Sequence, residues 1–227
     1  LADAEGHTPE SDDIPWCVEP GNAVTIEDVD FLLGSHFEGT PYDPYGTQGT
    51  PESRHRYRPI GINRTGHMVA MQIRPYAPAE SRSIMWISYG SGAFTTAAPF
   101  YANVDDTPAY LRDTTPEVST DCLYWTNRLI AALADAHFYE TSNAIEAFSE
   151  GVRVFGHRLV ERTDAELERS EQVGQLGQYE QSSEQPEQTA GGPVAACLES
   201  ANAEMAEYLR KHATKLLNDV LYTSSNL

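Results

Sequence analysis

Residues 67–90 read HMVAMQIRPYAPAESRSIMWISYG, and this stretch decides the fold class. Its two ends, 67–74 and 83–90, are short runs rich in branched and aromatic side chains, and the intervening PYAPAES is typical of a turn. The pattern predicts two neighbouring strands. In both runs the two alternating sets of side chains are largely apolar, which predicts a sheet that is buried on both faces.

The second run continues into an uncharged stretch, residues 83–104, which is 22 residues long. That length would span a bilayer if the stretch were apolar throughout. We expect a buried strand followed by a buried loop, and no membrane partner, because small and turn-forming residues interrupt the stretch. They are Gly90, Ser91, Gly92, Thr95, Thr96 and Pro99.

The apolar period becomes helical in the second half of the chain. We expect one helix within 120–138 and another over 140–170, where apolar residues repeat at alternating threes and fours. Pro193 opens a last helix, so 193–227 should be a C-terminal helix and tail with one apolar stripe. The stripe is expected to pack on the rest of the fold, with a homo-oligomer interface as the alternative. Strands and helices together predict an α+β protein.

Three other segments differ from these elements in composition, and a short helix follows the first of them. Residues 1–24 are a polar tail and lead-in, and Thr25 is placed to cap a short helix. Residues 37–52 are too rich in proline and glycine for a helix and should form an ordered loop. Residues 171–192 are rich in Gln, Glu and Gly, which predicts a mobile linker.

The formal charge is -19, from 34 acidic and 15 basic residues. The first 53 residues contain twelve acidic side chains and neither Lys nor Arg. Such a field repels phosphate backbones and anionic lipids, so nucleic acid is excluded as an expected partner. The charge fits a solvated surface.

No short motif of a common enzyme class is present: the chain has no GxSxG, HExxH, Walker or Rossmann glycine pattern. The seven histidines match no metal-ligand spacing, so we expect no metal or other cofactor and structurally satisfied histidines. The three cysteines are Cys17, Cys122 and Cys197, and their wide spacing favours reduced thiols in a cytoplasmic protein. The first residues lack the features of a signal peptide.

Four blocks of sequence occur in the same order in the bacterial PepD-type dipeptidase family, whose C-terminal part the chain resembles. They are FEGTPYDPYGTQGTPE (37–52), YRPIGINRTGHMVAMQIR (57–74), MWISYGSGAFTTAAPFYANVDDTPAY (85–110) and CLYWTNRL (122–129). The resemblance spans 16–138 and is specific, because several irregular turn and strand blocks recur in sequence.

The resemblance implies a dipeptidase of the N-terminal-nucleophile class, with a four-layer αββα sandwich to which residues 25–139 contribute the C-terminal part. In that class a processed N-terminal cysteine attacks the peptide carbonyl, and its own α-amino group serves as the base. The nucleophile would then lie in an N-terminal half that is absent here. That half and a dipeptide substrate are the implied partners, and this chain alone would be inactive.

The same resemblance suggests site residues within the chain. Arg64, on the strand read from INRTGHMVAMQIR, would support the nucleophile, because a nearby cation favours a thiolate and orients a carboxylate. Arg74 is the reserve, and a structural ion pair is the alternative for both. Tyr42, Asp43 and Tyr45 would wall the substrate pocket, with Asp43 near the substrate amine. A turn held by an Asx-type bond is the alternative for these three.

Two other functions remain open from the sequence. One is an amide hydrolase of the same fold that acts on a non-peptide substrate, because a fold does not fix the reaction. The other is a non-catalytic scaffold that binds a partner through its helices. An N-terminal cysteine in the encoded precursor would favour the enzyme over the scaffold.

Overall fold

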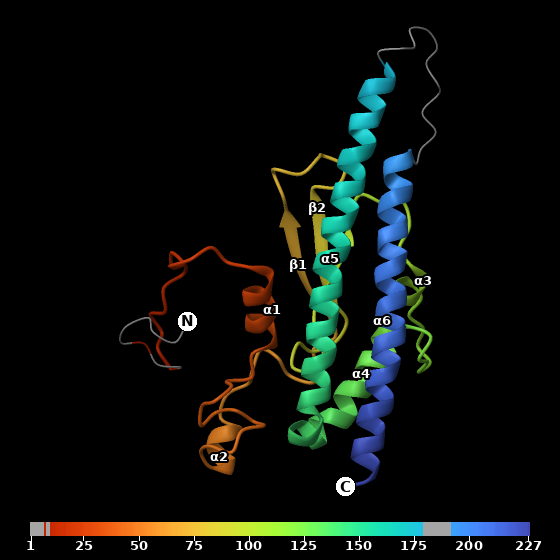
Figure 1. Ribbon diagram of the computed structural model, residues 1–227. Coiled ribbons are helices and arrows are strands. Elements are labelled where there is room, and N and C mark those ends of the chain that lie inside the picture. Colours follow the sequence, from red (N-terminus) through yellow and green to blue (C-terminus); the bar gives the residue numbers. More distant parts are fainter. Residues whose placement is uncertain (1–6, 8–9, 179–191) are drawn as a thin grey trace.

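The computed structural model describes residues 7, 10–178 and 192–227 (Figure 1). Helices and one small antiparallel sheet make up this part of the chain, which confirms the α+β class. The 3-10 turn η1 (Asp135–His137) joins α4 to α5. The helices and strands are α1 (Ile26–Gly34), α2 (Pro51–Arg54), β1 (Met68–Ile73), β2 (Ser83–Ser88), β3 (Ala98–Tyr101), α3 (Ala109–Arg112), α4 (Leu123–Ala134), α5 (Phe138–Gln178) and α6 (Pro193–Ser225).

The sheet has the order β1-β2-β3, and β2 pairs with both neighbours in antiparallel register. Strands β1 and β2 confirm the two predicted strands. Ala70 lies opposite Trp86, so their side chains share one face of the sheet. The Trp86 indole donates to the Gln72 side chain at 3.0 Å on that same face.

Strand β3 lies where the sequence predicted a buried loop. Its four residues include Pro99, which has no N–H to contribute to a ladder. Helix α6 completes the outer edge of this strand with a side chain. The Tyr101 N–H donates to Asn202 Oδ1 at 2.8 Å, and Asn202 Nδ2 donates to the Tyr101 carbonyl at 3.0 Å. The amide thus takes the place of a fourth strand.

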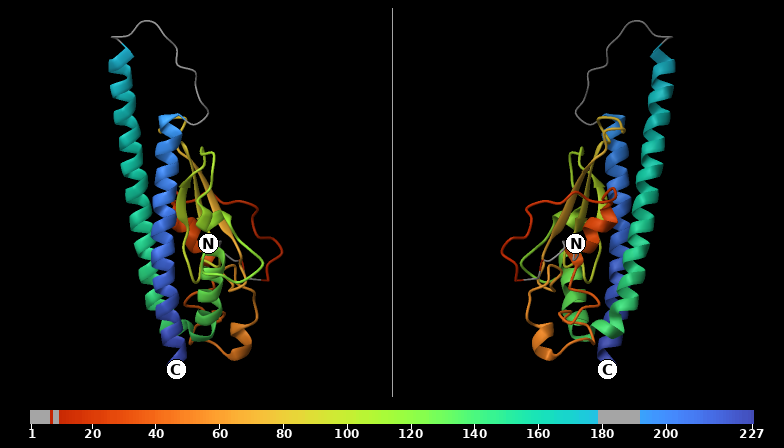
Figure 2. Two further views of the ribbon diagram at one scale, coloured as in Figure 1. Left: turned by 90° about the vertical axis from the view of Figure 1, so that its right-hand side faces the viewer. Right: turned by 90° about the vertical axis from the view of Figure 1, so that its left-hand side faces the viewer.

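The two long helices α5 and α6 run side by side in opposite directions along one face of the sheet (Figure 2). Ile84 and Trp86 point to this face and are almost fully buried. Gly156 on α5 permits the close approach, because a Cβ there would lie 2.6 Å from Pro99 Cδ. Burial of each such large apolar side chain stabilises the fold by about 1.5–3 kcal/mol.

The other face of the sheet is open at β1. Met71 and Ile73 point to this face, and they are 79% and 70% exposed. The prediction of a sheet buried on both faces is therefore wrong for this strand. The physical reason is that α5 and α6 cover one face only, and no other described segment covers these two side chains.

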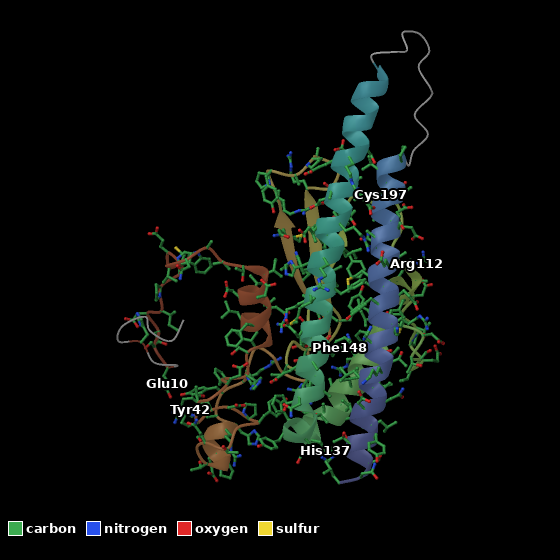
Figure 3. The ribbon with its side chains drawn as sticks, in the orientation of Figure 1. Glu10, Tyr42, Arg112, His137, Phe148 and Cys197 are labelled. Carbon is green, nitrogen blue, oxygen red and sulfur yellow. The ribbon has the colours of Figure 1, made fainter. Side chains whose placement is uncertain are left out.

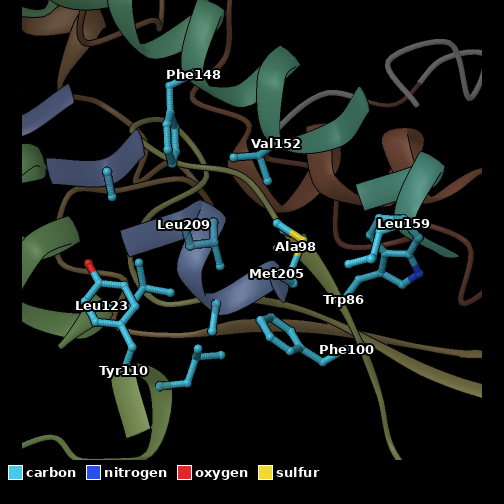
Figure 4. Packing of buried hydrophobic residues seen from close by; sticks show 14 of the residues in the cluster. Trp86, Ala98, Phe100, Tyr110, Leu123, Phe148, Val152, Leu159, Met205 and Leu209 are labelled. Atoms are coloured by element: carbon cyan, nitrogen blue, oxygen red, sulfur yellow. The ribbon is translucent and has the colours of Figure 1, made fainter. Parts of the chain in front are cut away.

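The hydrophobic core lies where α5 and α6 meet the sheet and α4. Figure 4 shows Phe148 and Val152 of α5 near Met205 and Leu209 of α6. The predicted apolar stripe of the last helix is buried within the chain, so it packs on the rest of the fold as expected. Its members are Leu198, Ala201, Met205, Leu209, Leu216 and Val220.

Helix α5 continues to Gln178, beyond the expected end of that helix at 170. Residues 171–178 are thus helical, although the sequence predicted that a mobile linker begins there. Glu and Gln have high helix propensity, which explains the continuation. The rest of the predicted linker, 179–191, lies outside the described residues. No helix in the described part of the chain is both long and apolar enough to cross a membrane.

Candidate functional site

A cavity of about 250 Å³ opens between α1, the loop after β2 and the start of α5, and we call it the α1–α5 pocket. It adjoins the proline- and glycine-rich loop 37–52, from which the sequence predicted substrate-binding residues. Polar side chains from all these segments line it, among them Asp30, His36, Glu38, Thr95, Ser149 and Arg153.

Three glycines fix the floor of this region. A Cβ on Gly61 would lie 2.0 Å from the Gly34 carbonyl oxygen, and a Cβ on Gly92 would lie 2.6 Å from Gly34 Cα. Both distances are far shorter than ordinary van der Waals contact. The end of α1 therefore packs directly on two backbone segments, and larger residues there would displace α1 from the pocket.

Asp43 is buried and pairs with the pocket residue His36. The His36 Nδ1 and Asp43 Oδ1 atoms are 2.9 Å apart, and both residues are less than a tenth exposed. The other ring nitrogen lies 3.5 Å from Glu38 Oε1. The Tyr45 N–H also donates to Asp43 Oδ1 at 2.9 Å, so the Asx-type turn that was the alternative for this loop is present.

Tyr45 connects the loop to η1. Its hydroxyl donates to Asp135 Oδ1 at 2.6 Å, and its ring stacks on Phe138 at a centroid distance of 4.1 Å. Burial, followed by the hydrogen bond to Asp135, raises the pKa of Tyr45 well above its ordinary value. The phenol therefore stays protonated and acts as a hydrogen-bond donor. Asn63 donates to the other oxygen of Asp135 at 2.5 Å, which ties the turn before β1 to the same carboxylate.

Tyr42, the third predicted pocket residue, lies apart from this group. Its ring contacts Tyr57 edge-on at a centroid distance of 4.9 Å. Figure 3 shows Tyr42 near α2 and away from the helix pair. The structure thus brings Asp43 and Tyr45 together next to His36, while Tyr42 belongs to a separate aromatic contact.

Arg64 lies in an exposed turn before β1, not on the strand as expected. The turn is closed by the Thr65 N–H, which donates to the Ile62 carbonyl at 3.0 Å, and the strand begins only at Met68. Arg64 makes no ion pair within the described part of the chain, so the structural alternative for it is not present there. Its catalytic role stays a prediction.

Arg74, the reserve candidate, is structural. It is 4% exposed and pairs with Asp164 of α5, donating from both terminal nitrogens. It also donates to the Ser81 carbonyl at 2.6 Å. These contacts join the end of β1 to α5 and leave the guanidinium outside the α1–α5 pocket.

Sequence patterns did not point to two of the pocket residues, Asp30 and His36. Asp30 of α1 accepts hydrogen bonds from the Thr96 hydroxyl at 2.6 Å and from the Ala97 N–H at 3.2 Å. Burial raises its pKa above the ordinary value. Asp30 lies one turn after Ile26, on the side of the helix that faces the protein. An acidic residue at such a position is a signal of a buried polar site that the sequence alone could provide. His36 was expected only as a satisfied histidine, and its pairing with Asp43 fits that expectation.

Comparison with known proteins places the chain in a family. The family model described as peptidase family C69 matches residues 2–151. A protein of Bifidobacterium longum named "Dipeptidase" is 45% identical over 238 residues, which cover 96% of this chain and 45% of that protein. A "Probable dipeptidase A" of Streptococcus pyogenes is 39% identical, covering 96% of this chain and 42% of that protein.

A further relative, "Dipeptidase A" of Lactobacillus helveticus, is 36% identical over 71% of this chain and 34% of that protein. The chain therefore spans less than half the length of these curated relatives. The resemblance that the sequence blocks indicated is confirmed, and the chain belongs to peptidase family C69.

Proposed function

We propose that the chain is the C-terminal part of a cytoplasmic dipeptidase, which hydrolyses the peptide bond of short peptides without a metal. The observation that carries this proposal is the 45% identity to a protein named as a dipeptidase, along nearly the whole chain. The chain spans less than half the length of these relatives. This supports the view that the part of the enzyme outside this chain supplies further residues of the site.

The nucleophile is an N-terminal cysteine in that remaining part, and its α-amino group is the base. Attack by the thiolate on the peptide carbonyl gives a thioester and releases the first product amine, and water then hydrolyses the thioester. All three cysteines of this chain are internal, so none carries a free α-amino group of its own. Cys17 is exposed and Cys122 is buried, and neither has a cationic partner in the contacts described.

The remaining part also supplies a second sheet, which completes a four-layer αββα sandwich. The open face of β1 and β2 supports this arrangement, because five of its side chains are apolar and two of these, Met71 and Ile73, are exposed. A second sheet packed there would bury them. They are Val69, Met71, Ile73, Met85 and Ile87.

Arg64 supports the nucleophile in the complete enzyme. Its side chain is exposed, and its charge is not neutralised by an ion pair within the described residues. The turn that carries it is anchored on both sides: Arg128 donates to the Asn63 carbonyl at 2.7 Å, and the Gly90 N–H donates to the Gly66 carbonyl at 3.1 Å. A cation held on such a fixed turn can favour a thiolate in a neighbouring segment.

The test uses the full-length protein encoded by the gene. N-terminal sequencing and intact mass should reveal a mature N-terminal cysteine, and its replacement by alanine should abolish dipeptide hydrolysis. Cys17→Ser is the matched control, since it removes an exposed thiol and should leave turnover unchanged.

Activity in a protein whose mature N-terminus is not cysteine would contradict the proposal, as would loss of activity in Cys17→Ser. Hydrolysis of non-peptide amides without hydrolysis of dipeptides would favour the other amide hydrolase. A chain with neither activity would favour the scaffold.

A further inference from the structure

The described lining of the α1–α5 pocket contains no cysteine, and it combines charged, hydroxyl and apolar side chains as a small-molecule binding site does. Its volume of about 250 Å³ is slightly below the range of about 300–1,000 Å³ that is usual for drug-sized ligands. The occupant is therefore small, on the scale of an amino acid or a dipeptide.

The charges around the pocket favour a cationic group. Asp30, Glu38 and Glu146 contribute three carboxylates, and Arg153 contributes the one guanidinium among the described lining residues. Arg153 is already partly neutralised, since its Nη2 lies 3.3 Å from Glu150 Oε2. An ammonium group would meet an excess of negative charge, whereas an isolated anion would be repelled.

Asp30 is the most buried of these carboxylates, and it is held in a fixed orientation. Each of its oxygens accepts one hydrogen bond from the segment after β2 and keeps a further lone pair. Burial raises its pKa, which means that the folded protein solvates the charged form poorly. The charge of Arg153 offsets this effect only in part, and a bound ammonium would stabilise the carboxylate further.

Ser149 provides an independent indication of a ligand. It is 9% exposed, lines the pocket from α5, and its hydroxyl makes no hydrogen bond within the described part of the chain. Its oxygen is accessible from the pocket, so a polar ligand there can reach it. Thr95, across the pocket, is 5% exposed and only accepts a long bond of 3.4 Å from Asn127. Both hydroxyls could bond to a polar ligand.

The rest of the wall is apolar. Phe31 of α1 and Phe138 and Ile145 of α5 line the pocket beside the charged groups. A carboxylate excess, one guanidinium and an apolar wall within so small a volume match the ammonium, carboxylate and aliphatic side chain of an α-amino acid.

We propose that the α1–α5 pocket binds the free α-amino group of an amino acid or of the first residue of a dipeptide. Asp30 and Glu38 receive the ammonium, Ser149 hydrogen-bonds to the ligand, and Phe31 and Ile145 contact its side chain. The choice of this ligand class rests on the proposed function, because the substrates and products of a dipeptidase carry such an ammonium.

Isothermal titration calorimetry on the full-length protein tests the proposal with L-leucine and N-acetyl-L-leucine. L-leucine should bind, and N-acetyl-L-leucine should bind at least about tenfold more weakly, because acetylation removes the ammonium charge. Equal affinity for the two probes would overturn the proposal, as would absence of L-leucine binding together with an unchanged KM for alanyl-leucine in Asp30→Asn.

Two pocket variants locate the site. Asp30→Asn keeps the shape of the side chain and should weaken L-leucine binding by about tenfold or more. Ser149→Leu fills the pocket and should abolish binding. Glu207→Gln is a matching acid-to-amide change and Ser200→Leu the same serine-to-leucine change at exposed positions of α6, and both should bind like the unmodified protein. Unmodified affinity in both pocket variants would overturn the proposal, and thermal unfolding verifies that each variant is folded.

Kinetics with alanyl-leucine distinguish substrate from product. A rise of about tenfold in KM for Asp30→Asn, with kcat within about threefold, would assign the pocket to the substrate's ammonium. An unchanged KM with weakened L-leucine binding would assign it to the free amino acid. If the unmodified protein binds L-leucine but hydrolyses no dipeptide, the proposed function fails and the pocket proposal stands. If the unmodified protein hydrolyses dipeptides but both pocket variants bind L-leucine with unmodified affinity, the proposed function stands and the pocket proposal fails.

Discussion

The side chain of Asn202 on α6 forms two hydrogen bonds with the backbone of Tyr101 on β3, in the position that a neighbouring strand would occupy. Both residues are buried, so water cannot replace these bonds. One amide therefore joins the last helix to the edge of the sheet and closes that edge to further strand pairing.

Asn202→Ala should lower the free energy of unfolding by about 2–4 kcal/mol, because it leaves a buried N–H and a buried carbonyl of Tyr101 unpaired. Denaturant unfolding measures the change. Asn143→Ala is the control, since Asn143 is exposed on α5 and should change stability by less than about 0.5 kcal/mol. Equal stability of the two variants would show that the Asn202 bonds contribute little.

Arg64→Met should lower dipeptide turnover of the full-length enzyme by about tenfold or more, on the order of 1.4 kcal/mol of barrier. Its thermal stability should be nearly unchanged, because Arg64 is exposed and makes no ion pair among the described residues. Arg58→Met removes another exposed arginine nearby and should leave turnover unchanged. Unchanged turnover in Arg64→Met would remove Arg64 from the site.

Arg74→Met should act on stability. Removal of this buried guanidinium leaves the Ser81 carbonyl without this donor and Asp164 with the Tyr101 hydroxyl but no cation, at a cost of about 3 kcal/mol or more. Denaturant unfolding should show this loss, while Arg158→Met, at an exposed position of α5, should be nearly neutral. A stability loss no larger than that of Arg158→Met would contradict the structural role of Arg74.

Asp30 should make stability depend on pH. Its pKa is raised by burial in the folded chain, so folding favours the protonated acid. Stability from this group is thus fully present below the unfolded pKa of about 3.9 and is lost as pH rises through the folded pKa. Asp30→Asn lacks the titration, so its stability relative to the unmodified protein should increase across that range.

Glu207→Gln is the control for this pH dependence. The hydrogen bond from Arg210 lowers the pKa of Glu207, so its contribution to stability is lost as pH falls through the folded pKa. The stability difference for this variant should change with pH in the opposite direction. Parallel pH profiles for Asp30→Asn and the unmodified protein would refute the raised pKa of Asp30.

Local sequence patterns predicted the elements that are determined by interactions between residues close together in the sequence. Strands β1 and β2 follow from their composition, and the cap at Thr25 is present as a capping box with Asp28. Strand β3 was missed because Pro99 is a poor strand residue and the group that completes the strand's edge, Asn202, lies 101 residues away from Tyr101. No local pattern contains such a partner.

The candidate site shows the same division. The proline and glycine content of residues 37–52 predicts an ordered loop, and the Asx-type bond of Asp43 is one of the two alternatives that its sequence allows. The pocket beside it is not predicted, because α1, the loop after β2 and α5 meet there only through tertiary packing. Arg64 was placed on a strand that begins four residues later, an error at an element boundary.

We propose that the nucleophile lies in the N-terminal half of the enzyme and not in this chain. The most direct test is to measure dipeptide hydrolysis by this 227-residue chain, alone and co-expressed with the N-terminal half. Alone, the chain should show no hydrolysis above background at any pH or with any added metal, and the open face of β1 should make it poorly soluble. Co-expression should restore solubility and activity, and co-expression with the terminal cysteine of that half changed to alanine should restore solubility only. Metal-independent dipeptidase activity in the purified chain alone, surviving removal of trace contaminants, would contradict the proposal and direct attention to Cys17 and the histidines.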